Sequence, residues 1–137
     1  MPYELFDHTA DLGIRVRADD LEGLFAEAAT ALFAAIVGDV SSIRHSQQLR
    51  LNISGAQHDL LLLDWLSELL YVFETQHLVF SQFQVQLGPA GLAATCHGEP
   101  FSETRHAAQH EVKAITYHGL KVDQTPTGWL AEVIVDI

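Results

Sequence analysis

The fold is decided first by residues 3–17, which read YELFDHTADLGIRVR. Short apolar-alternating runs at the two ends of this stretch, Tyr3 to Phe6 and Gly13 to Arg17, predict two strands. The segment from Asp7 to Asp11 is then a tight connection between strands. A turn needs about one Asp for its own geometry. This connection holds two carboxylates, an imidazole and a hydroxyl, which is more polar chemistry than a turn requires.

The rest of the chain predicts helices packed on strands. Acidic residues at 19–22 open a helix whose apolar positions recur to Ile36, with Gly38 as a C-cap, and a second helix runs from about Asp59 to Gln76. Strands are expected at 49–53, 79–87, 92–97, 111–118, 120–123 and 129–137. The predicted fold class is α+β: a two-layer sandwich in which two amphipathic helices pack a mostly antiparallel sheet, with residues 1–137 as a single domain.

Composition places the chain among ordinary globular proteins. Its 137 residues are 48% hydrophobic and 18% charged, which is enough to build a core. Cys96 is the only cysteine, so no internal disulfide can form and a reducing compartment is expected. No apolar run approaches the roughly 18–20 residues that span a bilayer. These features predict a cytoplasmic protein that does not bind membranes.

The charge balance restricts the partners. The chain has 7 basic and 18 acidic residues, a formal net charge of −11. Affinity for a phosphate backbone comes from basic residues that displace counterions, so autonomous binding to DNA or RNA is disfavoured. If RNA takes part in the function, we expect a basic protein partner to hold it. An acidic surface also favours cations.

The two ends of the chain carry the candidate metal ligands. Asp11, together with Asp7, offers carboxylate oxygens, the ligands that Ca²⁺ and Mg²⁺ prefer. The apolar strand Val133-Ile134-Val135 ends on Asp136 and on the terminal carboxylate of Ile137. An ordered end of this kind brings two carboxylates to one place. The alternatives are an Asx-turn at residues 7–11 and a strand that simply ends.

Weaker candidates lie in the middle of the chain. Asp64 and Glu68 are one turn apart on the second predicted helix, where they form either a ligand pair or a solvated face. Strand alternation over residues 111–118 places Lys113 mid-strand on one face and His118 on the other. P-loop, HExxH, CxxC and GxSxG motifs are absent from the sequence, so an independent nucleophilic enzyme is poorly supported.

Four segments together resemble the archease family. They are DHTADLGI at residues 7–14, LDWLSELLY at 63–71, EVKAITYH at 111–118 and VIVDI at 133–137. They occur in the family's order and reach from the seventh residue to the last. The resemblance implies an archease-type α+β sandwich. It also implies a non-enzymatic role as a protein cofactor of the RtcB-type RNA ligase in tRNA splicing and RNA repair, which promotes guanylylation of the ligase histidine and multiple turnover.

The resemblance also implies a divalent cation, with Ca²⁺ expected and Mg²⁺ as the alternative. Carried over by motif, its ligands are Asp11, Asp136 and the terminal carboxylate of Ile137. His8, Lys113 and His118 fall inside family motifs without an assigned role. Two other functional classes stay open: a small metal-dependent hydrolase that uses His8 and Asp11, and a general chaperone or methyltransferase modulator.

Overall fold

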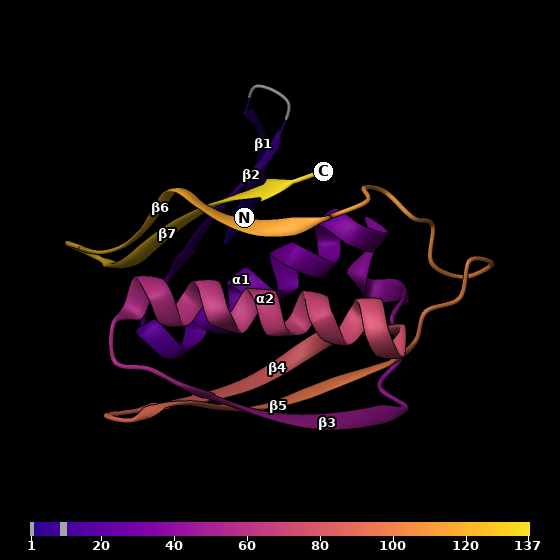
Figure 1. The fold of residues 1–137 in the computed structure, drawn as a ribbon, viewed down its shortest axis with the longest axis horizontal. Coiled ribbons are helices and arrows are strands. Elements are labelled where there is room, and N and C mark those ends of the chain that lie inside the picture. Colours follow the sequence, from indigo (N-terminus) through magenta and orange to yellow (C-terminus); the bar gives the residue numbers. More distant parts are fainter. Residues whose placement is uncertain (1, 9–10) are drawn as a thin grey trace.

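The structure, a computed structural model, describes residues 2–8 and 11–137 (Figure 1). Its elements, in chain order, are β1 (Tyr3–His8), β2 (Asp11–Ala18), α1 (Leu21–Val37), the 3₁₀ turn η1 (Val40–Ser42), β3 (Gln47–Ser54), α2 (His58–Gln76), β4 (Leu78–Gly88), β5 (Gly91–Pro100), β6 (Ala114–Thr125) and β7 (Gly128–Asp136). β1 and β2 extend further toward each other than the sequence predicts. The carboxylates of Asp7 and Asp11 therefore belong to strand ends, and Thr9 and Ala10 of the predicted connection lie outside the described residues.

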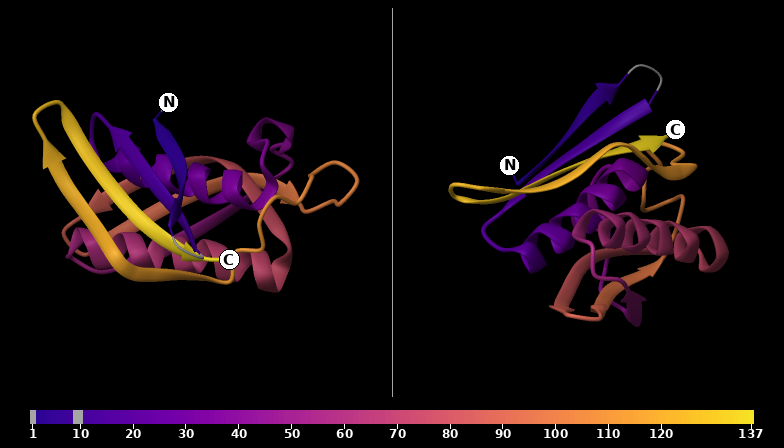
Figure 2. Two further views of the ribbon diagram at one scale, coloured as in Figure 1. Left: turned by 90° about the horizontal axis from the view of Figure 1, so that it is seen from above. Right: turned by 60° about the vertical axis from the view of Figure 1, so that its left-hand side comes forward.

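The strands form a four-stranded sheet in the order β1-β2-β7-β6 and a three-stranded sheet in the order β3-β5-β4, and each pairing is antiparallel. α1 and α2 lie between the two sheets, as Figures 1 and 2 show. The predicted α+β class with antiparallel strands is confirmed. The structure adds the division into two sheets, which gives the helices a strand layer on each side.

Helix α1 begins and ends where its sequence predicts. Asp20 is the N-cap, and its side chain accepts a hydrogen bond of 2.7 Å from the Gly23 amide. Gly38 is the C-cap, with φ of 80°, and its N–H donates to the Ala34 carbonyl. Between the caps the helix is buried on nearly every side, because it packs against β4 of one sheet and β2 of the other. The many alanines of its sequence allow both sheets to approach its backbone.

Helix α2 presents one apolar stripe to the core. The fully buried Trp65 anchors it, and its indole N–H donates to the Phe25 carbonyl of α1 at 3.0 Å. The helix ends at Gln76, and the C-cap His77 adopts the left-handed conformation with φ of 57°. Among the described residues, neither α1 nor α2 has both the length and the apolar character needed to cross a bilayer.

The connection from β5 to β6 differs from the prediction. A strand was expected to begin at Glu111, but β6 begins at Ala114 and continues to Thr125 through a register shift between Thr116 and Lys121. Residues 101–113 cross from the three-stranded to the four-stranded sheet, and on the way the amides at 109 and 110 donate to the last carbonyls of α1. Lys113 lies just before the first residue of β6, and its amide donates to the Asp136 carbonyl of β7 at 2.7 Å. The prediction that Lys113 lies mid-strand is therefore wrong.

Candidate functional site

Three strands of the four-stranded sheet end together around Asp136. The β2–β7 pairing ends at Leu12 and Val135, so Asp11 and Asp136 each lie one residue beyond the last pair on neighbouring strands. On the other side of β7, Asp136 pairs with Ala114, and its carbonyl accepts the Lys113 N–H at 2.7 Å. The Asp136 side chain is exposed and Asp11 is half-buried. The structure thus brings the two predicted carboxylates to the same end of one sheet.

Ile137 follows β7 directly, and its side chain packs against the core. A packed side chain restrains its residue, so the usual fraying of a strand end is opposed here. Within residues 2–8 and 11–137, no group of three or more His, Cys, Asp or Glu side chains is placed to hold a metal ion. The metal site therefore stays a prediction that rests on two side chains and the carboxylate of Ile137.

The histidines of the predicted site lie side by side. His8 pairs with Asp11 across the β1–β2 hairpin, and its ring centroid is 5.9 Å from that of His118 in the irregular part of β6. The Nδ1 atom of His8 is buried and has no hydrogen-bond partner among the described residues. The His118 amide donates to the Thr116 hydroxyl at 3.3 Å. These rings lie beside the strand ends that carry the carboxylates.

The other weak candidates are placed differently. Asp7, on β1, pairs with Leu12 and points into solvent at the tip of the hairpin strands. Asp64 lies midway along α2, a different element from the strand ends, and its side chain is exposed. Lys113 reaches the site through its backbone amide, and its side chain is exposed. Of the weak candidates, His8, His118 and Lys113 therefore lie with Asp11, Asp136 and Ile137 at this end of the sheet.

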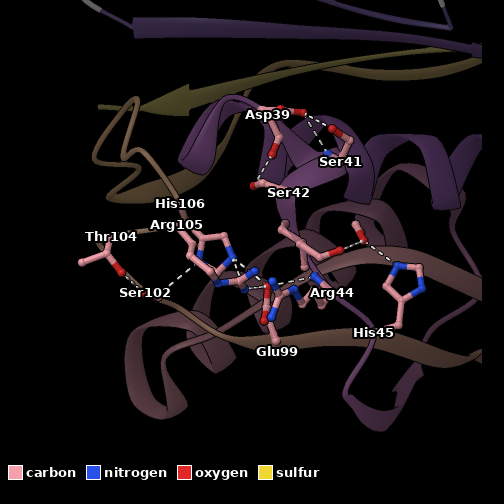
Figure 3. A network of polar contacts seen from close by, with 12 residues as sticks. Asp39, Ser41, Ser42, Arg44, His45, Glu99, Ser102, Thr104, Arg105 and His106 are labelled. Carbon is pink, nitrogen blue, oxygen red and sulfur yellow. Dashed lines mark hydrogen bonds and ion pairs between the residues drawn. The ribbon is translucent and has the colours of Figure 1, made fainter.

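A buried polar cluster was missed by sequence reasoning. One carboxylate oxygen of Glu99 accepts hydrogen bonds from the Arg44 amide and from Nε2 of His106, each at 2.8 Å. The same oxygen forms an ion pair with Arg105 (Figure 3). The Nδ1 atom of His106 accepts the Ser102 amide at 2.9 Å, so that nitrogen carries no proton and Nε2–H is the donor to Glu99. His106 is fully buried and Glu99 nearly so.

This Glu99 cluster ties the 101–113 connection to the rest of the fold. Burial alone would raise the pKa of Glu99, but the Arg44 amide, His106 and Arg105 together lower the pKa to about 2. The carboxylate is ionised at neutral pH. No local spacing could have revealed the cluster, because Arg44 and Glu99 are 55 positions apart in the chain.

Charge is unevenly distributed over the fold. Strands β3, β4 and β5 contain a single acidic residue, Glu99, and its carboxylate is engaged in the buried cluster. The remaining acidic residues belong to the four-stranded sheet, the helices and the connections. Several basic residues are already paired with carboxylates: Arg15, Arg17, Arg105 and Lys121. The three-stranded sheet therefore carries little negative charge, and the acidic residues lie on the rest of the fold, Asp11 and Asp136 among them.

Comparison with known proteins gives consistent results over almost the whole chain. A sequence profile of the Archease protein family (MTH1598/TM1083) matches residues 3–137. The protein archease of Pyrococcus furiosus is 39% identical over 140 aligned residues that cover 98% of both chains, and that of Methanopyrus kandleri is 38% identical with complete coverage of both.

Two solved structures share the fold. The solution structure of Methanobacterium thermoautotrophicum protein 1598 superposes with a TM-score of 0.87 at 35% identity, and the match covers 99% of each chain. A crystal structure from Thermotoga maritima, described as an archease and possible chaperone, superposes with a TM-score of 0.69 at 18% identity, covering 98% of this chain and 96% of that one. At that identity the second match supports the fold alone.

Proposed function

This chain belongs to the archease family, and from that membership we propose that it is a non-enzymatic activator of an RtcB-type RNA ligase. In this proposal it acts in the cytoplasm during tRNA splicing and RNA repair, where it promotes guanylylation of the ligase histidine and so allows multiple turnover. The observation that carries the proposal is the family match over residues 3–137, which includes both strand ends. RNA is contacted through the ligase, not by this chain alone.

The charge of the chain supports a basic protein partner. A net charge of −11 repels nucleic acid and attracts a basic surface, which an RNA-binding cleft must have. Strands β1 and β2 project from the body of the fold, as Figure 2 shows, and this end of the sheet carries the carboxylates of Asp7, Asp11 and Asp136. A projecting acidic end can enter a basic cleft without competing for the RNA backbone.

The donor set at the sheet end fits a hard divalent cation. Asp11 and Asp136 offer only carboxylate oxygens, and we propose that they hold Ca²⁺, or Mg²⁺, together with the carboxylate of Ile137. Ca²⁺ takes about six to eight oxygen ligands, so these three groups supply part of the shell and water or phosphate oxygens the remainder. When bound, such a cation would supply positive charge at the sheet end. The contribution of the chain is to hold the carboxylates at fixed positions on hydrogen-bonded strands.

Replacing Asp136 by Ala tests this proposal. We expect Asp136→Ala to abolish stimulation of the ligase and to weaken Ca²⁺ binding measured by calorimetry, with the circular dichroism spectrum unchanged. Asp123→Ala is the matched control, because Asp123 is an exposed carboxylate in β6 whose partner Leu130 lies toward the opposite end of β7. Full stimulation by Asp136→Ala would refute the proposed role of the sheet end.

Two other functions predict different outcomes. A metal-dependent hydrolase could use the cross-strand neighbours His8 and Asp11, and it requires phosphoester turnover by the isolated protein that Asp11→Ala removes. A general chaperone or methyltransferase modulator would act through exposed apolar side chains such as Leu60, Tyr71 and Tyr117. That function requires suppression of client aggregation, or a change in methyltransferase activity, without any ligase.

A further inference from the structure

A groove lies where α1, α2 and the 101–113 connection meet, and neither the strand ends nor the proposed cation uses it. Its cavity volume is about 430 Å³, within the range of ligand pockets. The apolar part of its wall comes from Ile36, Phe73, Phe101, Ala108 and Val112. We propose that this groove receives a lysine or arginine side chain, with its apolar neighbour, from a basic segment of a protein partner.

The groove is held in shape from two sides. At one end the Phe101 amide donates to the His77 carbonyl at 2.7 Å, which fixes the connection to the C-cap of α2. At the other end the Gln109 and His110 amides donate to the carbonyls of Ile36 and Ala35 at 2.8 and 3.1 Å. Between these points the Glu99 cluster anchors the connection through buried His106. A wall pinned in this way loses little conformational freedom when a ligand binds.

The electrostatics of the groove favour a cation. Glu74 and Glu111 line it and are exposed, and the opposing charged side chain is Lys113, alongside the titratable His110. The C-terminal ends of α1 and α2 both reach the groove, and in the described chain neither helix has a basic residue in its last turn. The negative end of each helix dipole is therefore not balanced by a side chain. Two carboxylates outweigh one ammonium group, and the end of α2 adds negative potential, whereas carbonyls in the last turn of α1 already accept the Gln109 and His110 amides.

The aromatic residues of the groove favour a basic side chain over an inorganic cation. Phe73 and Phe101 contact each other edge to face with ring centroids 5.8 Å apart, and both are half-buried. Lysine and arginine carry an apolar stem that packs on such rings while the charged end reaches the carboxylates at the rim. A small inorganic cation would leave the apolar wall uncovered. The combination of rings and carboxylates therefore fits a basic side chain rather than a metal ion.

The position of the groove lets one partner reach both features. Lys113 lines the groove, and its backbone N–H donates to the Asp136 carbonyl at the sheet end. A protein that surrounds the Asp136 end therefore passes close to the groove. This inference rests on the proposed function only in taking that partner to be the RtcB-type ligase.

The first test uses a peptide of the proposed chemistry. We expect acetyl-Leu-Arg-Leu-amide, titrated into the ¹⁵N-labelled protein, to shift the amide signals of Phe101 and residues 108–112. The analogue with citrulline in place of arginine keeps the shape and removes the charge, and it should bind several-fold more weakly. The double variant Glu74→Gln, Glu111→Gln should bind the arginine peptide with roughly fivefold lower affinity. The exposed Glu103 lies in the same connection but outside the groove lining, so Glu103→Gln should leave binding unchanged.

The second test uses the ligase of the same organism. For the Glu74→Gln, Glu111→Gln double variant, the concentration that gives half-maximal stimulation of the ligase should rise roughly fivefold. The maximal turnover of the ligase should be unchanged, because the strand-end carboxylates are intact. Equal binding of both peptides, or shifts outside the groove, would overturn the inference, and so would an unchanged half-maximal concentration. If the unaltered protein fails to stimulate an active ligase, the proposed function fails, and the peptide titration alone then decides on the groove.

Discussion

Replacing Glu99 by Ala should destabilise the protein strongly, although the residue lies outside the strand ends. The substitution removes the acceptor for the Arg44 amide and for the Nε2–H of His106, both at 2.8 Å, and the ion-pair partner of Arg105. His106 is fully buried, so water cannot replace the lost acceptor there without opening the connection. The Arg105 side chain is 32% exposed, so its guanidinium can be rehydrated.

The magnitude follows from these donors. A hydrogen bond to a charged group contributes about 1.5–3 kcal/mol, and removing one member of a buried charged cluster costs about 3–5 kcal/mol. Because Arg105 regains water, we expect the free energy of unfolding to fall by about 3 kcal/mol. Small proteins have a free energy of unfolding of about 5–15 kcal/mol. The loss would lower Tm by roughly 10 °C for a chain of this size.

The stability difference between the unaltered protein and Glu99→Ala should depend on pH. The pKa of Glu99 is about 2 in the folded protein, below its ordinary value of 4.5. A carboxyl whose pKa is depressed by folding stabilises the fold above its unfolded pKa, and the contribution is lost as pH falls toward the folded pKa. The difference in stability between the unaltered protein and Glu99→Ala should therefore be largest at pH 6–7 and shrink between about pH 4.5 and 2.

Urea unfolding at several pH values measures this difference. The control is Glu103→Ala, since Glu103 is an exposed carboxylate in the same connection and should change stability by less than about 0.5 kcal/mol. A loss below about 1 kcal/mol for Glu99→Ala at pH 7 would refute the reasoning. A difference that stays constant from pH 7 to pH 3 would refute it as well, because the ionised carboxylate would then not be the stabilising group.

Three further predictions concern the core. Trp65→Phe should lower the free energy of unfolding by about 2–3 kcal/mol, because it removes a buried hydrogen bond to α1 and leaves a cavity; an unchanged urea midpoint would contradict this. Burial raises the pKa of the Cys96 thiol to about 12, so a thiol reagent at pH 8 should label it slowly in the native state and rapidly in urea; fast native labelling would show that the site opens. A Cβ at Gly98 would collide with the Val79 carbonyl oxygen of the neighbouring strand, whereas Gly88 has open space around it. In thermal denaturation, Gly98→Ala should therefore lower the free energy of unfolding by at least about 2 kcal/mol and Gly88→Ala by less than about 1 kcal/mol. Equal decreases would be inconsistent with the packing.

The local structure was predictable because its signals lie close together in the sequence. Asp20 and Gly38 cap α1 within a few residues of its ends, and the apolar spacing around Trp65 fixes the buried face of α2. The division of the strands between two sheets depends on pairings such as β3 with β5, whose residues are some 40 positions apart. The alternation of apolar and polar residues within a strand does not indicate which distant strand it pairs with.

The same contrast holds at the candidate site. The carboxylates of Asp11 and Asp136 were identified from the sequence, Asp11 in a connection between two predicted strands and Asp136 at the end of one, and the structure places them at the start of β2 and the end of β7, on neighbouring strands. The start of β6 at Ala114 was not predictable, because the hydrogen bonds that tie residues 109 and 110 to α1 join segments far apart in the sequence. The Glu99 cluster was equally hidden, because its members come from three separate segments of the chain.

The most direct test of the proposed function is multiple-turnover RNA joining by the RtcB-type ligase of the same organism, with and without this protein. The proposal predicts that ligated RNA exceeds one equivalent of ligase only when the protein is present, and that Asp136→Ala removes this excess. Product limited to one equivalent in both reactions, from a ligase shown to be active in a single turnover, would contradict it.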